Sequence, residues 1–495
     1  MKRPLNYFLI CIFASLVLSC NFSEKKGNPG TADQGNADSI AKPNIIYILA
    51  DDLGYGDLGV YGQQKFKTPN IDKLASQGMR FTQHYSGSTV CAPSRSALMT
   101  GMHTGHTVVR GNKEMRPEGQ YPIPDSTYTL AEALQTAGYT TGAFGKWGLG
   151  PPNSEGDPLN QGFDTFYGYN CQRLGHNYYP YHLWSNNDSI VLSDNAGGER
   201  GTYAPDLIHQ ETLKFIDNNK QGPFFLYVPS IIPHAELVAP EEDMAKHRDK
   251  YPPEKEYEGV DEGPEFNLGP YRSQPESHAA FVAMIDVLDM QVGEIMQKVE
   301  DLGIAGNTII VFTSDNGPHE EGGADPDYFD SNGPLKGVKR DLYEGGIRVP
   351  MIIKWPGKIA SGSKTEHISA FWDVLPTFSE IAGVQIPKNT DGISFLPTLT
   401  EQEEQQKEHE YLYWEFHERG GRQAVRKGKW KAVKYNVFKR PDAALELYNL
   451  EEDIGEENNI AKSHPEIVKE MEALIDSART PSEVFTFGQG TYSGK

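Results

Sequence analysis

The hydrophobic and polar positions of this chain follow two alternating patterns from Pro43 onward. Short apolar runs rich in β-branched and aromatic residues predict buried strands, and the longer amphipathic runs between them predict helices. Strands are predicted at 44–50, 140–145, 223–229 and 307–313, and helices at 69–77, 128–138, 204–219 and 279–303. Strands that alternate with helices are typical of a parallel sheet. We therefore predict an α/β fold in which helices sandwich a large, mostly parallel sheet.

The pattern changes near residue 390. Segments 410–416, 422–436 and 445–450 have the short apolar runs of antiparallel strands, and 465–478 follows with a helical period. We therefore predict a main domain over 43–390 and a smaller α+β subdomain, built on an antiparallel sheet, over 391–495.

The first 42 residues have a different character. Residues 1–20 begin with two basic residues and continue with an apolar run too short to favour a membrane span, which predicts a secretory signal peptide. The segment VLSC resembles a bacterial lipobox, in which Cys20 becomes the lipidated first residue of the mature chain. Residues 21–42 are rich in Gly, Asn, Ser, Asp and Lys and predict a flexible linker. We expect an exported protein of the periplasm or cell surface, attached to the membrane by its lipid anchor alone.

Charge and cysteine content narrow the possible partners. The net charge of −22 argues against nucleic acid, and an anionic substrate would need a local group of positive charges. Cys91 and Cys171 are the cysteines of the mature body, and in an oxidising compartment they could form a disulfide.

Polar side chains follow each predicted strand of the main domain. They are Asp51 and Asp52 after the first strand, Lys146 after the second, His234 beyond the third, and Asp315 and Asn316 after the fourth. The carboxyl ends of parallel strands meet at one edge of a sheet, where sites form. Carboxylate and amide oxygens suit Ca²⁺ or Mg²⁺ rather than zinc. The alternative is that each Asp pair only caps a turn, although two pairs at matching strand ends favour a metal.

The stretch CAPSRSALMTG contains a cysteine in an unusual setting. Cys91 is predicted just before a helix N-terminus, with Pro93 in the first turn and Arg95 one turn further. A thiol nucleophile needs a base beside it, and a hard metal ion prefers oxygen to sulfur. We infer that Cys91 does not act as a cysteine.

These motifs together resemble the formylglycine-dependent sulfatases of the alkaline phosphatase superfamily. The C-x-P-S-R element at Cys91 is preceded by ADDLGYGD and followed by GKW, TSDNG and LYEGGIRVP, in that family's order. The resemblance implies an alkaline phosphatase-like fold, a sulfatase domain over 43–390, and sulfuric ester hydrolase activity. It also implies that a formylglycine-generating enzyme oxidises Cys91 to formylglycine, whose hydrated aldehyde is the nucleophile.

The resemblance assigns roles by position. Asp51, Asp52, Asp315 and Asn316 match calcium ligands, and modified Cys91 would also contact the metal, so the cofactors are Ca²⁺ (or Mg²⁺) and formylglycine.

The remaining matched residues would bind the nucleophile and the substrate. Arg95 would steady the formylglycine hydrate, and Lys146 and Lys339 would bind sulfate oxygens. Lys336 competes with Lys339, which has the family's spacing to the following Tyr and Glu. His234 would face the ester oxygen of the leaving group. The alternative is that the lysines are solvated surface charges and His234 is an ordinary loop histidine.

The sequence departs from the family at Gly148. Many relatives read G-K-W-H, and their histidine bonds to the formylglycine hydrate, whereas this chain reads G-K-W-G. His103 or His106 could take over that role, or both could be loop histidines.

The aromatic and polar run at 170–184 favours a sugar substrate, since aromatic rings stack on sugars and Arg and His bind their polar groups. The alternative is that its tyrosines belong to the core. The resemblance suggests a bacterial sulfatase acting on a sulfated saccharide, such as a galactose or N-acetylgalactosamine sulfate. Two other functions stay open at this point: a phosphoester or phosphonate hydrolase of the same superfamily, and a non-catalytic glycan-binding lipoprotein.

Overall fold

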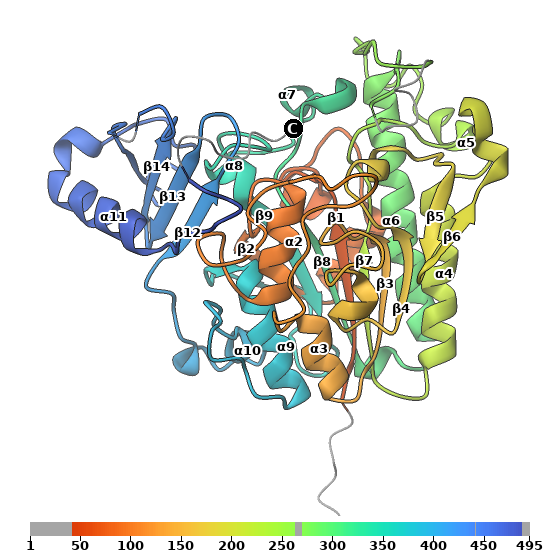
Figure 1. Cartoon of the computed structure of the whole chain (residues 1–495), viewed down its shortest axis with the longest axis horizontal. Helices are drawn as coiled ribbons and strands as arrows, with labels where there is room; N and C mark the ends of the chain where they lie inside the picture. Colours follow the sequence, from red (N-terminus) through yellow and green to blue (C-terminus); the bar gives the residue numbers. More distant parts are fainter. Residues whose placement is uncertain (1–41, 263–269, 441, 488–495) are drawn as a thin grey trace, which may run out of the picture. The chain divides into compact units, whose positions relative to one another are not determined.

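The computed structural model describes residues 42–262, 270–440 and 442–487. The predicted signal peptide (1–20), the lipidation site at Cys20 and the predicted linker up to Ala41 lie outside the described residues. The described part contains two sheets: a large one of eleven strands and a small one of four strands near the C-terminus (Figure 1). No helix among the described residues is long and apolar enough to cross a membrane.

Five parallel strands form the centre of the large sheet. In spatial order they are β8 (Thr308–Ser314), β1 (Asn44–Ala50), β7 (Phe224–Pro229), β3 (Thr140–Lys146) and β4 (Thr165–Tyr169). Nearly every residue in them is buried, as expected for parallel strands covered on both faces. The four strands predicted from the apolar runs are all present here, and the prediction of a large, mostly parallel sheet is confirmed.

Antiparallel pairs extend the sheet at both sides, and two short strands add parallel pairs at one outer edge. Beyond β8 lie β9 (Arg348–Lys354) and β2 (Met79–Tyr85), and β2 in turn pairs with β10 (Ser363–Thr365) and β11 (Ser369–Ala370). Beyond β4 lie β5 (His182–Ser185) and β6 (Asp188–Val191). The sheet is therefore parallel where the predicted strands lie and mixed towards its edges.

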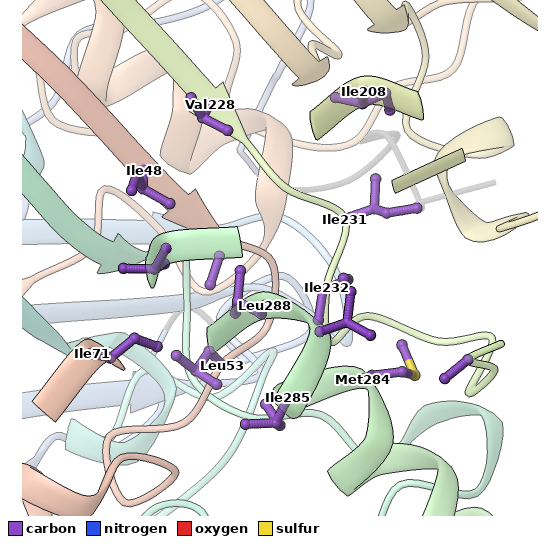
Figure 2. Close-up of a cluster of buried hydrophobic side chains, with 14 of the residues drawn as sticks. Ile48, Leu53, Ile71, Ile208, Val228, Ile231, Ile232, Met284, Ile285 and Leu288 are labelled. Atoms are coloured by element: carbon purple, nitrogen blue, oxygen red, sulfur yellow. The ribbon is translucent and has the colours of Figure 1, made fainter. Parts of the chain in front are cut away.

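Helices cover both faces, and β1 shows why the sequence permits this. Its side chains alternate between two cores, with Ile46 and Ile48 in one and Ile45, Tyr47 and Leu49 in the other. The first core, part of which Figure 2 shows, also contains buried residues of α1 (Pro69–Ser76), α4 (Ala204–Asn219) and α6 (Ser277–Asp301). The second contains residues of α2 (Cys91–Thr100), α3 (Leu130–Thr136) and α9 (Val374–Ala382). Short helices α5 (Glu241–Met244), α7 (Pro326–Phe329), α8 (Glu344–Ile347) and α10 (Leu396–Leu399) lie in the connections.

The small sheet is antiparallel, as predicted. Its order is β12 (Leu412–Phe416), β13 (Arg422–Lys427), β14 (Trp430–Tyr435) and β15 (Glu446–Asn449). One face packs against α11 (Pro465–Ser477), and the other packs Trp414 and Phe416 against Tyr85 and Trp372 of the main domain. Phe395 and Leu399 lie in a core of the large sheet. A boundary at residue 390 stays a prediction, because all residues from Lys42 onward belong to one compact unit.

Candidate active site

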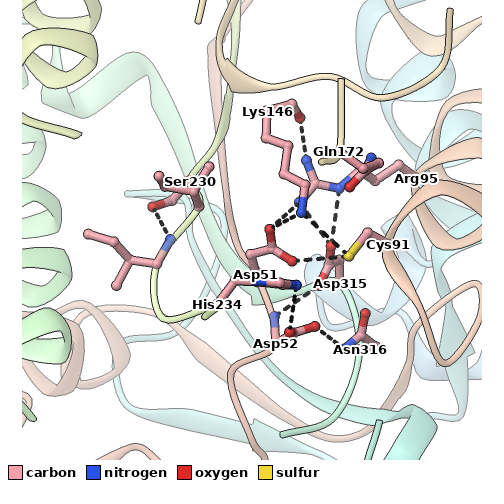
Figure 3. A network of polar contacts seen from close by, with 12 residues as sticks. Asp51, Asp52, Cys91, Arg95, Lys146, Gln172, Ser230, His234, Asp315 and Asn316 are labelled. Atoms are coloured by element: carbon pink, nitrogen blue, oxygen red, sulfur yellow. Dashed lines mark hydrogen bonds and ion pairs between the residues drawn. The ribbon is translucent and has the colours of Figure 1, made fainter. Parts of the chain in front are cut away.

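Carboxylates converge where β1 and β8 end side by side. Asp51 and Asp52 directly follow β1, Asp315 and Asn316 directly follow β8, and all four are fully buried. The amide of Asn316 donates to Asp52 Oδ1 at 2.7 Å, and the backbone N–H of Asp52 donates to Asp315 Oδ1 at 3.1 Å (Figure 3). The parallel pairing of β1 with β8 therefore brings these four predicted metal ligands together.

Cys91 faces this carboxylate group from the start of α2. The helix begins at Cys91 itself, one position earlier than the sequence predicts, and Val90 is the capping residue. The Sγ atom lies 3.2 Å from Asp51 Oδ1 and 3.7 Å from the Nζ atom of Lys146. Both Cys91 and Cys171 are buried and free, so the disulfide that the sequence allowed is not formed. Burial, together with the negative charge of Asp51, raises the pKa of the Cys91 thiol well above its ordinary value.

Two cationic side chains balance the carboxylates around Cys91. Arg95 donates to Asp315 Oδ2 at 2.9 and 3.1 Å, and it also donates to the backbone carbonyl of Lys146. Lys146, the last residue of β3, lies 2.6 Å from Asp51 Oδ2. Burial alone would raise the pKa of Asp51, but Lys146 and the neighbouring cations outweigh it and hold that pKa far below its ordinary value. For Asp315 burial and the charge of Asp51 prevail and raise the pKa to about 7.

His234 and Lys339 form the other side of the site. Lys339 Nζ lies 2.7 Å from Asp52 Oδ2 and 2.9 Å from His234 Nε2. The other ring nitrogen of His234 contacts the Ala235 carbonyl, to which it must donate, so Nε2 is the acceptor in the neutral ring. Burial and the charges of Lys339 and Lys146 lower the pKa of His234 well below its ordinary value.

Lys336, the competing lysine, is directed elsewhere. It donates to the Glu456 carbonyl at 2.9 Å and its ammonium lies 4.1 Å from the ring centre of Tyr343. Of the two lysines, Lys339 is the one that the structure brings to the carboxylates.

Two neighbouring histidine rings stack against His234. The rings of His176 and His319 stack on it, with centroid distances of 4.6 and 5.6 Å. Stacking against two rings restricts rotation of the imidazole, so Nε2 keeps its direction towards the site.

Glu321 is a site residue that the sequence reasoning missed. Its carboxylate lies 2.8 Å from Lys339 Nζ and also pairs with Arg340. It follows the TSDNG motif within the same loop, and an acidic residue so close to a predicted ligand pair was the available signal. Lys339 is therefore shared between two carboxylates.

A cavity of about 200 Å³ opens over these side chains. Its floor carries Cys91, Lys146, His234 and Lys339, and its walls are formed by Asn112, Glu114, Gln120, Gln172, Arg173, His176, Tyr271 and Arg340. The cavity thus offers several charged and amide side chains around a cationic floor, which suits a polar anionic ligand.

The run at 170–184 contributes to this cavity through its polar residues. Gln172, Arg173 and His176 line it, whereas Tyr178 and Tyr179 are buried and belong to the main core. For these two tyrosines the alternative interpretation, that they are core residues, is the correct one.

His103 and His106 do not line the cavity. Both rings contact Asp391, with His106 Nδ1 at 2.9 Å and His103 Nε2 at 3.7 Å from its carboxylate oxygens. Neither histidine takes the place of the side chain that Gly148 lacks.

The site can hold a hard divalent cation. Asp51, Asp52, Cys91 and His234 offer ligand atoms that lie within 4.8 Å of one another. Asn316 adds a buried Oδ1 atom that has no hydrogen-bond partner among the described residues. An unpaired amide oxygen beside buried carboxylates fits an oxygen-preferring metal and leaves that oxygen satisfied once the ion is bound.

Buried carboxylates, cations and a helix-start cysteine at the edge of a parallel sheet define a hydrolase site for a charged ester. Comparison with known proteins gives the family: the Sulfatase family model matches residues 43–384, and the model "N-sulphoglucosamine sulphohydrolase, C-terminal" matches 337–480. The chain belongs to the sulfatase family of the alkaline phosphatase superfamily.

Named relatives agree with this assignment. The chain is similar to an N-acetylgalactosamine-6-O-sulfatase of Bacteroides thetaiotaomicron, at 28% identity over 94% of this chain and 97% of the relative. It is 33% identical to the N-acetylgalactosamine-6-sulfatase of Rattus norvegicus over 72% of this chain, and it spans 66% of that enzyme's length. Among solved structures, Ps i-CgsB in complex with k-i-k-neocarrahexaose superposes with a TM-score of 0.72 at 30% identity, covering 88% of this chain and 92% of the other.

Proposed function

We propose that this sulfatase hydrolyses the sulfate ester of a sulfated saccharide, using a formylglycine made from Cys91 and a divalent metal. The observation that carries the proposal is the position of Cys91 on the floor of the cavity, against Asp51 and between cationic side chains. Sulfuric ester hydrolysis is the activity of the family to which the chain belongs.

The surroundings of Cys91 support its conversion. A cysteine nucleophile works as a thiolate and needs a lowered pKa, whereas burial and Asp51 raise the pKa of this thiol. When oxidised to formylglycine, residue 91 supplies a hydrated aldehyde with one hydroxyl to attack sulfur and a second to expel sulfate afterwards. The Arg95 guanidinium, fixed on Asp315, would orient this hydrate.

The metal would be held by Asp51, Asp52, Asp315 and Asn316, with residue 91 beside them. It would stabilise the developing oxyanion of the nucleophile and the charge of the sulfate. We propose Ca²⁺ as this ion, with Mg²⁺ as the alternative, because every protein ligand other than residue 91 is a carboxylate or amide oxygen.

Lys146 and Lys339 would bind the sulfate oxygens. Both are buried ammonium groups whose pKa is raised by carboxylates despite the opposing effect of burial, so both stay charged. Fixed cations on opposite sides of the floor would hold the sulfur in line with the nucleophile and offset its charge.

His234 would give a proton to the departing alcohol. In the ligand-free site its Nε2 atom accepts from Lys339 and the ring is neutral. A sulfate ester that binds Lys339 would remove that donor, and its negative charge would raise the pKa of the ring. The S–O ester bond would then break as Nε2 protonates the alcohol oxygen.

The substrate class follows from the cavity walls and the relatives. Arg, His, Tyr and amide side chains surround the cationic floor, which suits the hydroxyl and acidic groups of a sugar. The similar enzymes named above act on N-acetylgalactosamine 6-sulfate by their names. We propose a galactose or N-acetylgalactosamine sulfate as the sugar.

The test is expression with a formylglycine-generating enzyme, followed by mass spectrometry of the Cys91 peptide and assays on matched esters. We expect an aldehyde at residue 91, release of sulfate from sulfated galactose and N-acetylgalactosamine, and much slower turnover of nitrophenyl phosphate than of nitrophenyl sulfate. A fully active enzyme with an unmodified thiol would refute the mechanism. Faster turnover of the phosphate would favour a phosphoester hydrolase instead.

We further propose that the chain is exported and anchored through a lipid on Cys20. The lipobox-like segment VLSC and the polar residues after it support this. Cell fractionation of wild type and Cys20→Ala tests it: the variant should move from the membrane fraction to the soluble fraction while keeping its activity. Equal distribution of both would exclude the anchor.

A further inference from the structure

Gln172 occupies the space beside Gly148. Gly148 has a φ of +82°, and a Cβ atom built on it would overlap the Nε2 atom of Gln172 and lie 2.6 Å from its Cδ atom. The side chain that position 148 lacks is therefore replaced in space by a side chain from another loop.

The amide of Gln172 has a defined orientation. Its Nε2 atom points to the Trp147 carbonyl at 3.4 Å, and its backbone N–H donates to Gln120 Oε1 at 2.7 Å. With the amide reversed, Oε1 would face the Trp147 carbonyl oxygen, and two acceptors would repel each other. Nε2 is therefore the atom that faces Trp147, and Oε1 points away from it. Gln172 is only 5% exposed, and Oε1 has no hydrogen-bond partner among the described residues.

A buried acceptor without a donor is costly, so its presence in a functional cavity indicates a missing partner. Gln172 lines the same cavity as Cys91 and Lys146, and Figure 3 draws all three residues. The acceptor is thus available to an O–H or N–H donor that enters the cavity or is created at residue 91.

We propose that the Oε1 atom of Gln172 accepts a hydrogen bond from a hydroxyl of the formylglycine hydrate at residue 91 and positions that hydrate. The proposal rests on the proposed function, which supplies the hydrate. It gives the role left open by Gly148 to a residue that comes from the loop after β4. Because an amide oxygen is not basic near neutral pH, Gln172 orients the hydroxyl but does not take its proton.

The first test measures stability without substrate. Wild type and Gln172→Met, each prepared with and without the formylglycine-generating enzyme, form a double-mutant cycle in melting temperature. Met has a similar shape but no acceptor. Conversion of Cys91 should raise the melting temperature of wild type more than that of the variant, by about 1–2 °C for one neutral hydrogen bond in a chain of this size. An equal effect of conversion in both would overturn the proposal.

Gln161 provides a matched control. It is also a buried glutamine whose Nε2 donates to a backbone carbonyl, that of Glu155 at 2.8 Å, and whose Oε1 lacks a partner among the described residues, but it does not line the cavity. Gln161→Met should lower the melting temperature of both forms equally and leave kcat unchanged. This separates loss of a buried amide from loss of a contact to residue 91.

The second test measures turnover. Gln172→Met should lower kcat about tenfold with little change in KM, since the lost hydrogen bond orients the nucleophile rather than the substrate. Gly148→Ala should lower kcat by a similar factor, because its Cβ atom would displace the Gln172 amide. In a Gln172→Met background, the same Gly148→Ala change should lower kcat little further. A change in KM alone, or fully additive effects of the two substitutions, would overturn the proposal.

Mass spectrometry of each preparation distinguishes a failure of the proposed function from a failure of the role proposed for Gln172. Without an aldehyde at residue 91, the proposed function falls, and this proposal falls with it. With the aldehyde present and Gln172→Met indistinguishable from wild type, only the role of Gln172 is refuted.

Discussion

In the proposed reaction, a bound sulfate ester would compete with two carboxylates for the ammonium groups of Lys146 and Lys339. Lys146 lies 2.6 Å from Asp51, and Lys339 lies 2.7 Å from Asp52. These carboxylates are the same groups that a divalent cation would attract. At the scale of single residues, the proposed substrate and metal would therefore favour each other's binding, because the sulfate would pair with the lysines and the metal with the carboxylates that the lysines release.

Replacing Cys91 with Ser should stop the reaction after one step. A serine has a single hydroxyl, which can attack sulfur but leaves no second hydroxyl to expel the sulfate. We expect Cys91→Ser to fold normally and to release about one alcohol per enzyme molecule before arrest, measured as a burst with nitrophenyl sulfate. Cys171→Ala, which removes the other buried thiol, should keep turning over. Sustained turnover by Cys91→Ser would exclude an aldehyde mechanism.

His234 should matter most for substrates with poor leaving groups. General acid catalysis typically contributes about 10²–10⁴-fold. His234→Ala should lose that much kcat/KM on a sulfated sugar, whose alkoxide leaves poorly, and distinctly less on nitrophenyl sulfate, which leaves as a stabilised phenolate. The comparison uses both substrates with wild type and variant. Equal losses would mean that His234 binds sulfate or orders the cavity instead of donating a proton.

At the scale of elements, the metal site depends on the pairing of β1 with β8. Each strand contributes two side chains at its carboxyl end, so neither strand alone has a site. Asp315→Ala should lose the ion and most of the activity, because it removes one ligand and also the partner of Arg95. Elemental analysis and activity measure this, with Asp327→Ala, an exposed position on α7, as the control.

Chelation of wild type should have the same effect as Asp315→Ala, and adding back Ca²⁺ or Mg²⁺ in turn should show which ion restores activity. Binding to the native state also stabilises it, so the melting temperature should rise with the concentration of the effective ion. Full activity after exhaustive chelation, with no metal detected, would contradict the assignment.

The helices and strands also show which parts of the fold and site the sequence could predict. Apolar runs predicted the central strands because parallel strands buried on both faces are apolar throughout, and the predicted ligands follow directly at their ends. The strands β5 and β6 have only four residues each and mix polar with apolar residues, so they have no such run. Glu321 had a signal in its closeness to the predicted ligand pair, whereas Gln172 had none, because its loop meets the end of β3 only in the folded chain. The choice of Lys339 over Lys336 needed the family's spacing for the same reason.

At the scale of the whole molecule, a buried charge cluster joins the small sheet to the main domain. Lys431 of β14 lies 2.8 Å from Glu344 of α8, and Glu456 accepts the backbone N–H of Glu344 at 2.7 Å. Glu344 also pairs with Arg348 at the start of β9. The junction between the two sheets is therefore partly ionic, in addition to the aromatic contacts of Trp414.

This junction should make stability depend on pH. Burial and the charge of Glu344, opposed by Lys431, raise the pKa of Glu456 from 4.5 to about 8. Between pH 4.5 and about 8, Glu456 is ionised in the unfolded chain but protonated in the folded chain. The contribution of Glu456 to the free energy of unfolding therefore falls as the pH rises through this range. Glu456→Gln should remove this pH-dependent loss of stability. The variant should have a melting temperature a few degrees above that of wild type at pH 8.5, and the difference should be smaller at pH 5.

The exposed neighbour Glu457 offers the control for this measurement. Glu457→Gln should leave the pH dependence of the melting temperature as in wild type. A Glu456→Gln variant that melts below wild type at pH 8.5 would show that Glu456 is ionised and stabilising in the native junction.

The burial of α2 limits when the proposed modification of residue 91 could take place. All ten residues of the helix, from Cys91 to Thr100, are buried, and Cys91 is 2% exposed. An enzyme that must hold the segment from Cys91 to Arg95 in its own cleft cannot reach it in the folded chain. If Cys91 is converted to formylglycine as proposed, its oxidation would have to precede the burial of this helix, and a molecule that folds with the thiol in place would lack the nucleophile. The fraction of active protein would then depend on the rate of folding relative to the rate of oxidation.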